Sequence, residues 1–355
     1  MIHFCAGNPG QWLAQHRGKQ PVFACVLSFT ETALIPHISA AGISPQDRQY
    51  TALADAELLF SGAAARYPLP PLAAGISPAI ITRAILTRQA IPLHLLSTGL
   101  PSRLTVPHIK LPTVVARPVQ TGQAMTLEQS TQLLRSGLQW GQRLSRSDQY
   151  LIMGECVVGG TTTAQAVLSA LGYAVTGRIG SSHQRANHSQ KQALVSQGLA
   201  AWRQRGNLSS LAAAAAVGDP MQLVVAGMLL AASNQGGVLL AGGAQMLAVY
   251  ALARAIAQQQ QIAWRPDQVV VGTTRWVIED QSADTVAIAR ILGAPYLASQ
   301  IDFSQSPYFQ LRTYERGFVK EGLGAGGCAI AAYLYRGWTQ TQLRHAVEAE
   351  LRLCL

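Results

Sequence analysis

Short apolar runs of strand length alternate with helical stretches over most of this 355-residue chain. The apolar runs lie at 21–30, 91–99, 149–155, 237–242, 268–273 and 294–299. Helical stretches occupy 51–65, 77–89, 126–146, 162–172, 188–204, 207–217, 220–233, 244–260, 283–292, 325–336 and 339–353. Strands that alternate with helices in this way form a parallel sheet with helices on both faces. The sequence therefore predicts an α/β fold with a doubly wound, mostly parallel, Rossmann-like sheet.

The strand–helix alternation covers the middle of the chain more regularly than its ends. A chain of this length can form one large domain or two, since domains commonly hold about 100–200 residues. We expect a large α/β domain over residues 22–310. Residues 1–21 and 311–355 are predicted to form a smaller helical part together.

The charge balance narrows the class of partner. The chain carries 27 Lys and Arg against 17 Asp and Glu, a formal net charge of +10. A basic surplus suits nucleic acid, an anionic membrane or an anionic small molecule. The basic residues are scattered, without a basic arm or zinc finger, so we expect no nucleic acid. The most apolar region, 221–257, is interrupted by polar residues before it reaches the roughly 18–20 apolar residues of a membrane span. We therefore expect no membrane association, and the basic surplus is compatible with a phosphorylated small-molecule substrate.

The cysteines and the N-terminus bear on the compartment. The five cysteines are dispersed and form no CxxC pair, which indicates reduced thiols rather than a disulfide framework. The first twenty residues show no basic leader followed by an apolar stretch, so we expect no signal peptide. Both features predict a cytoplasmic protein.

In open parallel sheets, ligands bind beyond the carboxyl ends of the strands. The loops to search are therefore 28–45, 98–102, 154–163, 241–245, 272–280 and 298–306. In GECVVGGTTT, Gly159 and Gly160 permit a close approach of the backbone to a ligand. Thr161 and Thr162 then bring hydroxyls and free N–H groups to the start of a helix, which favours an anion such as phosphate. The alternative is an ordinary capped helix after a flexible turn.

A second glycine-rich stretch, KEGLGAGG, holds Glu321 just before an apolar helix. A carboxylate among glycines can face a ligand without side-chain screening and act as a general base. The alternative is a solvated carboxylate beside Lys320. The stretch contains the pattern G-x-G-x-x-G from Gly322 to Gly327, but it is too near the end of the chain for a dinucleotide-binding unit.

Two further segments could contribute to a site. Thr30 and Glu31 follow the first buried strand and offer a hydroxyl and a carboxylate at the same edge of the sheet. The loop 177–195 gathers Arg178, His183, Arg185, His188 and Lys191 around a Gly/Ser turn. It is either an anion-binding loop or a solvated surface loop. Its two histidines lack a metal-ligand spacing, so we expect no metal.

With these motifs, the chain resembles the nicotinate-nucleotide–dimethylbenzimidazole phosphoribosyltransferases of cobalamin biosynthesis, in particular their divergent archaeal and cyanobacterial branch. That family has Gly-Glu-x-Gly-x-x-Asn-Thr-Thr/Ser after a strand, and this chain matches it at Gly154, Glu155, Thr161 and Thr162. The family also has Gly-Glu-Gly-x-Gly-Ala-Ala near its C-terminus, which falls on Glu321. The chain departs from the first motif, because Gly160 replaces the Asn and Val157 replaces the middle Gly.

The resemblance implies transfer of a phosphoribosyl group from nicotinate mononucleotide to an azole base, dimethylbenzimidazole or an adenine-like base, in the synthesis of a cobamide lower ligand. It implies that Glu321 is the general base, that neither cofactor nor metal is needed, and that the protein is a homodimer. Phosphate and ribose contacts are implied for Gly154, Glu155, Gly159, Gly160, Thr161, Thr162, Lys191, Gly322 and Gly324. For contacts to the base we expect Thr30 and Glu31. Two alternatives stay open: a non-catalytic protein that binds a nucleotide or a corrinoid precursor, and another nucleotide-processing transferase on the same scaffold.

Overall fold

The computed structural model describes residues 1–42, 44–62, 66–67, 75–183 and 187–354. The end of the helix predicted over 51–65, and Arg185, lie outside the described residues. Within that part of the chain, one sheet holds eight strands in the order β1-β8-β7-β6-β5-β2-β3-β4. The strands are β1 (Ile2–Ala6), β2 (Pro21–Ser28), β3 (Leu93–Thr98), β4 (Ile109–Lys110), β5 (Tyr150–Cys156), β6 (Gly237–Ala241), β7 (Val269–Thr274) and β8 (Tyr296–Ser299).

Every pair of neighbouring strands is parallel except β1 and β8, which pair antiparallel. The chain runs outward from β2 through β3 to β4, then returns to the other side of β2 and continues from β5 to β8. The order β4-β3-β2-β5-β6-β7 is that of a dinucleotide-binding sheet, with its switch point between β2 and β5. The predicted doubly wound, mostly parallel α/β fold is confirmed.

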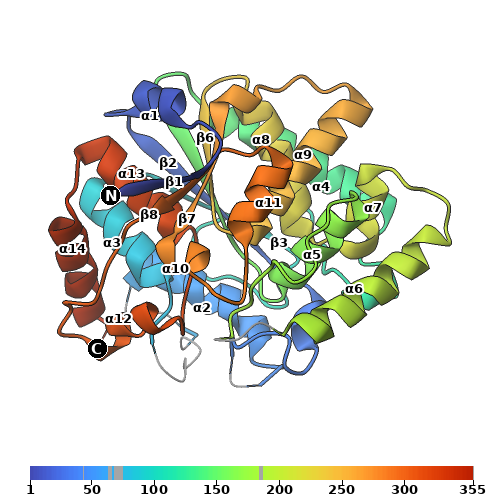
Figure 1. Ribbon diagram of the computed structural model, residues 1–355, viewed down its shortest axis with the longest axis horizontal. Helices are drawn as coiled ribbons and strands as arrows, with labels where there is room; N and C mark the ends of the chain where they lie inside the picture. The colour runs from blue at the N-terminus through green and yellow to red at the C-terminus, as the bar shows by residue number, and fades with distance from the viewer. Residues whose placement is uncertain (43, 63–65, 68–74, 184–186, 355) are drawn as a thin grey trace.

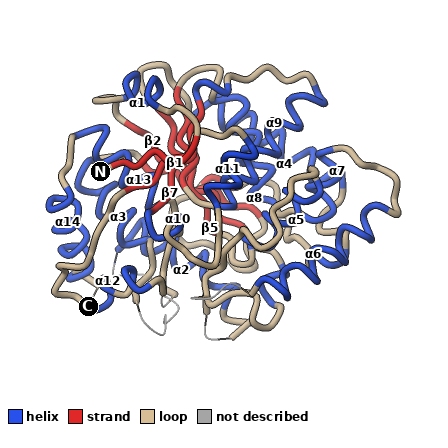
Figure 2. The backbone as a smooth tube through the Cα atoms, in the orientation of Figure 1, coloured by secondary structure: helices blue, strands red, loops and turns tan. Residues whose placement is uncertain are grey.

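Helices cover both faces of the sheet (Figures 1 and 2). One face carries α4 (Leu127–Leu144), α5 (Gly160–Ala170), α6 (His188–Arg203), α7 (Ser210–Val217), α8 (Pro220–Ala232), α9 (Ala244–Gln260) and α11 (Thr285–Leu292). The other carries α1 (Gly10–His16), α2 (Arg48–Ser61), α3 (Ala79–Gln89), α13 (Ala325–Arg336) and α14 (Gln340–Arg352). Shorter helices are α10 (Arg275–Ile278) and α12 (Phe309–Arg312), with 3-10 turns η1 (Glu31–Leu34), η3 (Val119–Thr121), η4 (Pro266–Gln268) and η5 (Tyr314–Arg316).

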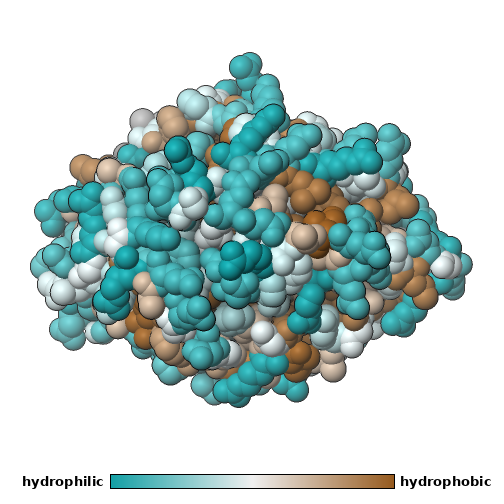
Figure 3. All heavy atoms as spheres, turned by 90° about the horizontal axis from the view of Figure 1, so that it is seen from above, coloured by the Kyte–Doolittle hydropathy of each residue, from teal (hydrophilic) through white to brown (hydrophobic). Residues whose placement is uncertain are grey.

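Alternate residues of the central strands belong to two separate hydrophobic cores, one on each face of the sheet. In β2, Val22, Ala24 and Val26 face the core under α8 and α9, while Phe23, Cys25 and Leu27 face the core under α3 and α13. This division follows from the two-residue period of a strand, and burial on both faces explains why the strands read as continuous apolar runs. Figure 3 shows a face of the molecule that is mostly hydrophilic, with smaller hydrophobic areas between.

The strands β1 and β4 and the short helices α1, α10 and α12 have no counterpart among the strand and helix ranges expected from the sequence. β1 is an edge strand whose first residues are partly or fully exposed, so it lacks the apolar run that marks the buried strands. It joins β8 in the main sheet.

The division into residues 22–310 and a smaller part from 1–21 and 311–355 stays a prediction. Within the described residues, every helix falls short of the length or apolarity that crossing a bilayer requires.

Helices α4 and α8 approach each other closely through glycines. A methyl group at Gly137 would overlap the carbonyl oxygen of Val224, and one at Gly227 would overlap that of Leu134. We expect Gly137→Ala to lower the free energy of unfolding by about 1–3 kcal/mol, as overpacked sites do. Urea unfolding measures it, with Gln139→Ala on the exposed side of α4 as the control. A Gly137→Ala protein that gains stability, as helix propensity alone predicts, would contradict this packing.

Candidate functional site

A cavity of about 450 Å³ lies at the carboxyl edge of the sheet. Its walls come from residues 38–41 after β2, 157–161 after β5, 243–245 after β6 and 277–285 after β7, and from 318–323 ahead of α13. Four of the six predicted loops therefore contribute, while 98–102 and 298–306 supply none of the described wall. The loops meet here because the carboxyl ends of parallel strands share one edge.

Glu321 enters this cavity from the turn before α13. Its Oε2 accepts hydrogen bonds from Thr273 Oγ1 at 2.9 Å and from Thr274 N at 3.0 Å. Its Oε1 accepts from Gly322 N at 3.1 Å and from Gly326 N at 3.2 Å. Strand β7 and helix α13 thus hold the carboxylate from both sides. Burial raises the pKa of Glu321 above its usual range, although all four donors favour the ionised form.

Two glycines of the second motif, Gly326 and Gly327, allow α13 to pack closely against the sheet. A methyl group at Gly326 would overlap the backbone of Thr273, and one at Gly327 would overlap Ala241. The start of α13 can therefore lie directly against β6 and β7, which brings the Gly326 N–H to Glu321. This close approach accounts for the G-x-G-x-x-G pattern without a dinucleotide.

The first motif reaches the same cavity. β5 ends at Cys156 and α5 begins at Gly160, with Gly159 as its N-cap in the left-handed region at φ 84°. Gly159, Gly160 and Thr161 line the cavity. Thr162 lies behind them, fully buried and outside the cavity wall. Of the four residues at the start of α5 that are expected to hold an anion, Gly159 to Thr162, three line the cavity that Glu321 also lines.

Glu155 also lines the cavity, and it is the most strongly perturbed acid there. Its Oε2 accepts from Val157 N at 3.0 Å and its Oε1 from Gln245 Nε2 at 2.8 Å. Burial raises the pKa of Glu155 to about 8, and the nearby charges of Asp219 and Glu321 add to the rise. Glu155 therefore holds its proton at neutral pH.

The Gln245 side chain, from α9, fills the space next to Gly160. A methyl group at Gly160 would overlap the Gln245 amide, so only glycine leaves room for this amide. The loop 241–245 was expected at the site for its glycines, and the contribution of Gln245 was missed. No local signal marks it, because its position depends on how α9 packs beside α5.

Lys191 does not line the cavity. It is fully buried, and its Nζ donates to the carbonyl oxygens of Gly180 and, at 3.3 Å, Ile179. Burial lowers the pKa of Lys191 to about 7. The lysine that does face the cavity is Lys320, whose Nζ bonds Asp280 Oδ2 at 2.6 Å. In the sequence, Lys320 is marked only by its position next to Glu321, and no local pattern there indicates that it faces a ligand.

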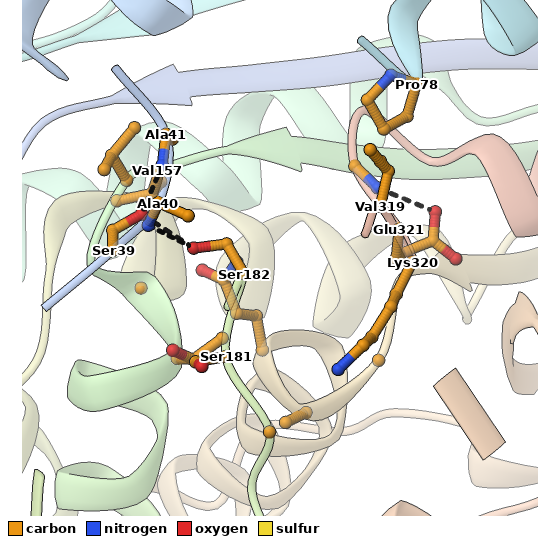
Figure 4. Close-up of a pocket in the computed structure, with 18 of the residues that line it drawn as sticks. Ser39, Ala40, Ala41, Pro78, Val157, Ser181, Ser182, Val319, Lys320 and Glu321 are labelled. Carbon is orange, nitrogen blue, oxygen red and sulfur yellow. Dashed lines mark hydrogen bonds between the residues drawn. The ribbon is translucent and has the colours of Figure 1, made fainter. Parts of the chain in front are cut away.

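The loop 177–195 contributes to the wall through its Gly/Ser turn. Gly180, Ser181, Ser182 and His183 line the cavity. In Figure 4, Lys320 extends from the Glu321 side toward the side that carries Ser181 and Ser182. The buried Lys191 braces this turn from behind. The loop therefore has a role at the cavity that a solvated surface loop would not have.

The other predicted residues lie as follows. Gly322 lines the cavity. Gly154 and Gly324 are not part of the cavity wall. They pack against the Phe23 ring and against each other. Thr30 is fully buried and caps η1 through a bond from Thr32 N. Neither Thr30 nor Glu31 is part of the cavity wall, so the structure does not bring them to the residues above. Their role in base binding stays a prediction.

The cavity combines acids and a cation suited to proton transfer near an anion. Glu155, Glu321 and Asp55 supply carboxyls, and Lys320 supplies an ammonium group. No group of three or more His, Cys, Asp or Glu side chains that could hold a metal ion occurs in the part of the chain that the structure describes.

Comparisons with known proteins agree on family and fold. A family model described as phosphoribosyltransferase matches residues 88–266. The chain is 54% identical to a UPF0284 protein of Acaryochloris marina, over 96% of this chain and 94% of the relative. It is 54% identical to a UPF0284 protein of Cyanothece sp., over 95% of this chain and 93% of the relative.

Among solved structures, the chain is similar to the nicotinate-nucleotide-dimethylbenzimidazole phosphoribosyltransferase of Thermus thermophilus. The TM-score is 0.62 at 18% identity, over 95% of this chain and 84% of that chain. A structure of CobT from the same organism gives a TM-score of 0.61 at 17% identity, over 96% and 89% of the two chains. The resemblance stated from the two glycine-rich motifs is confirmed.

The raised pKa of Glu155 predicts how stability changes with pH. Between the ordinary pKa of a glutamate and about 8, the folded protein holds a proton that the unfolded chain releases. The contribution of Glu155 to stability is therefore full at low pH and is lost as pH rises through this window. We expect Glu155→Gln to flatten the fall in the free energy of unfolding between about pH 5 and 8, measured by urea unfolding. Equal slopes for both proteins would contradict a protonated Glu155.

Proposed function

This chain belongs to the UPF0284 proteins and to the phosphoribosyltransferase family, and we propose that it transfers phosphoribosyl from nicotinate mononucleotide to an azole base of a cobamide lower ligand. The observation that carries the proposal is that Glu321 and the segment Gly159–Thr161 line one cavity. Its volume of about 450 Å³ lies within the range of small-molecule sites. A cytoplasmic location and a homodimer belong to the same proposal.

The phosphate is assigned to the start of α5. The dipole of α5 favours an anion at that end, where Gly159, Gly160 and Thr161 line the cavity. A charged Glu155 would repel a phosphate, but burial raises its pKa to about 8 and keeps it neutral. Anchoring the sugar at a distance from the reacting carbon fixes its orientation for attack.

The reaction balances without an added cofactor. The bond between the anomeric carbon and the pyridinium nitrogen breaks, and its electron pair leaves with nicotinate. An azole nitrogen attacks the anomeric carbon from the opposite face, so the configuration inverts. The N–H proton of the azole passes to Glu321, which acts as general base. The Thr273 hydroxyl can rotate, so of the four donors to Glu321 it is the one that can yield its place to the azole N–H.

We expect Glu321→Gln to lower kcat by about 10²–10⁴-fold, the contribution of a positioned general base. Binding of nicotinate mononucleotide, measured by calorimetry, should persist because the phosphate contacts lie elsewhere in the cavity. Glu128→Gln, at an exposed site on α4, is the matched control. Unchanged activity in Glu321→Gln would remove that residue from the role.

The non-catalytic alternative is separated by the same assays on the wild-type protein. Calorimetry with nicotinate mononucleotide reports binding, and chromatography with benzimidazole or adenine reports transfer. Binding without transfer would favour a nucleotide-binding protein, and absence of binding would reject the proposed function.

A further inference from the structure

The proposed reaction leaves one buried acid of the cavity without a task. Asp55 lies on α2, lines the cavity and is only 5% exposed. It forms no ion pair among the described residues. Burying a carboxylate without a cation beside it costs free energy. A hydrogen-bond donor on the bound ligand would offset part of this cost.

The present partners of Asp55 leave it acceptor capacity. Ser77 Oγ donates to Oδ1 at 2.6 Å, and Cys156 Sγ donates to Oδ2 at 3.6 Å. A carboxylate has about four acceptor positions, and a thiol is a weak donor. Burial raises the pKa of Asp55 to about 6, so it is still largely ionised at neutral pH.

A second unpaired group stands beside it. Thr51 lies one helical turn before Asp55 on the same face of α2 and also lines the cavity. Its Oγ1 is buried without a hydrogen-bond partner in the described structure. Two neighbouring side chains on one helix face thus both have unused hydrogen-bonding capacity beside the cavity.

A continuous wall connects Asp55 to Glu321. Ser77, bonded to Asp55, precedes Pro78, and a methyl group built on Gly322 would lie 3.2 Å from the Pro78 ring. Gly322 directly follows Glu321. In Figure 4, Pro78 and Val319 lie on the same side of the cavity as Glu321. The wall between the two acids thus includes the Pro78 ring and Gly322, against which a flat heterocycle can pack, with a carboxyl at each end.

We propose that Asp55 is the specificity-determining residue for the accepting base, and that it selects azoles carrying an amino group, the aminopurine class. The inference rests on the proposed function. With one ring N–H toward Glu321, the far edge of the heterocycle meets Asp55 and Thr51, where an amino group donates to the Asp55 carboxylate. The methyl groups of dimethylbenzimidazole would cover these groups without supplying a donor. A site built to hydrogen-bond its substrate rejects analogues that lack the donor.

The test compares adenine with dimethylbenzimidazole as acceptors, with nicotinate mononucleotide as donor. We expect the wild-type protein to show the higher kcat/KM for adenine. Asp55→Asn should lower kcat/KM for adenine by about 10–100-fold, the worth of a hydrogen bond to a charged group, and leave dimethylbenzimidazole within a few-fold. Asp47→Asn, an exposed aspartate that precedes α2, is the matched control.

Each outcome decides between the claims. Transfer to both bases with the same ratio in wild type and Asp55→Asn would overturn the role of Asp55 and leave the proposed function intact. Transfer to neither base would overturn the proposed function and this inference with it. If Asp55→Asn does not fold, as shown by urea unfolding, the wild-type ratio still tests the inference, and a preference for dimethylbenzimidazole would overturn it.

Discussion

The packing of α13 against the sheet without intervening side chains is the constraint on which the site depends. Gly326 and Gly327 let the helix start rest on the backbone of β6 and β7. Only at that distance do a strand hydroxyl and N–H groups from both elements converge on Glu321. The same contact closes the cavity on the side opposite α5. A helix held further away would leave the carboxylate to water, with an ordinary pKa.

Burial sets the charge of the cavity. The pKa of Glu155 rises to about 8 and that of Asp55 to about 6, so the acids do not ionise together as pH rises. Lys320 is paired with Asp280 and contributes little net charge. Glu155, beside α5, is thus protonated at neutral pH, whereas Asp55, on α2, is largely ionised. That asymmetry orients a molecule with an anionic end and a proton-donating end.

The fold followed from the sequence because each central strand is an apolar run buried on both faces and longer stretches of helical composition separate these runs. The motif residues Gly159, Gly160, Thr161 and Glu321 were also predictable, since glycines beside polar residues mark a close approach. Asp55 and Gln245 were not, because they enter the cavity only through the packing of α2 and α9. Lys191 was expected to contact a ligand because it lies in a basic loop. Its side chain is instead buried and donates to carbonyl oxygens of that loop.

The reversal of strand order between β2 and β5 has an evolutionary consequence. The wall that carries Asp55 and Pro78 derives from chain that follows β2, whereas the wall at Gly160 and Gln245 derives from chain that follows β5 and β6. The two walls meet where Cys156, at the end of β5, donates to Asp55. Away from that contact, a substitution in the earlier segment alters one half of the cavity and leaves the residues of the other half in place, so the two reactants can be exchanged separately.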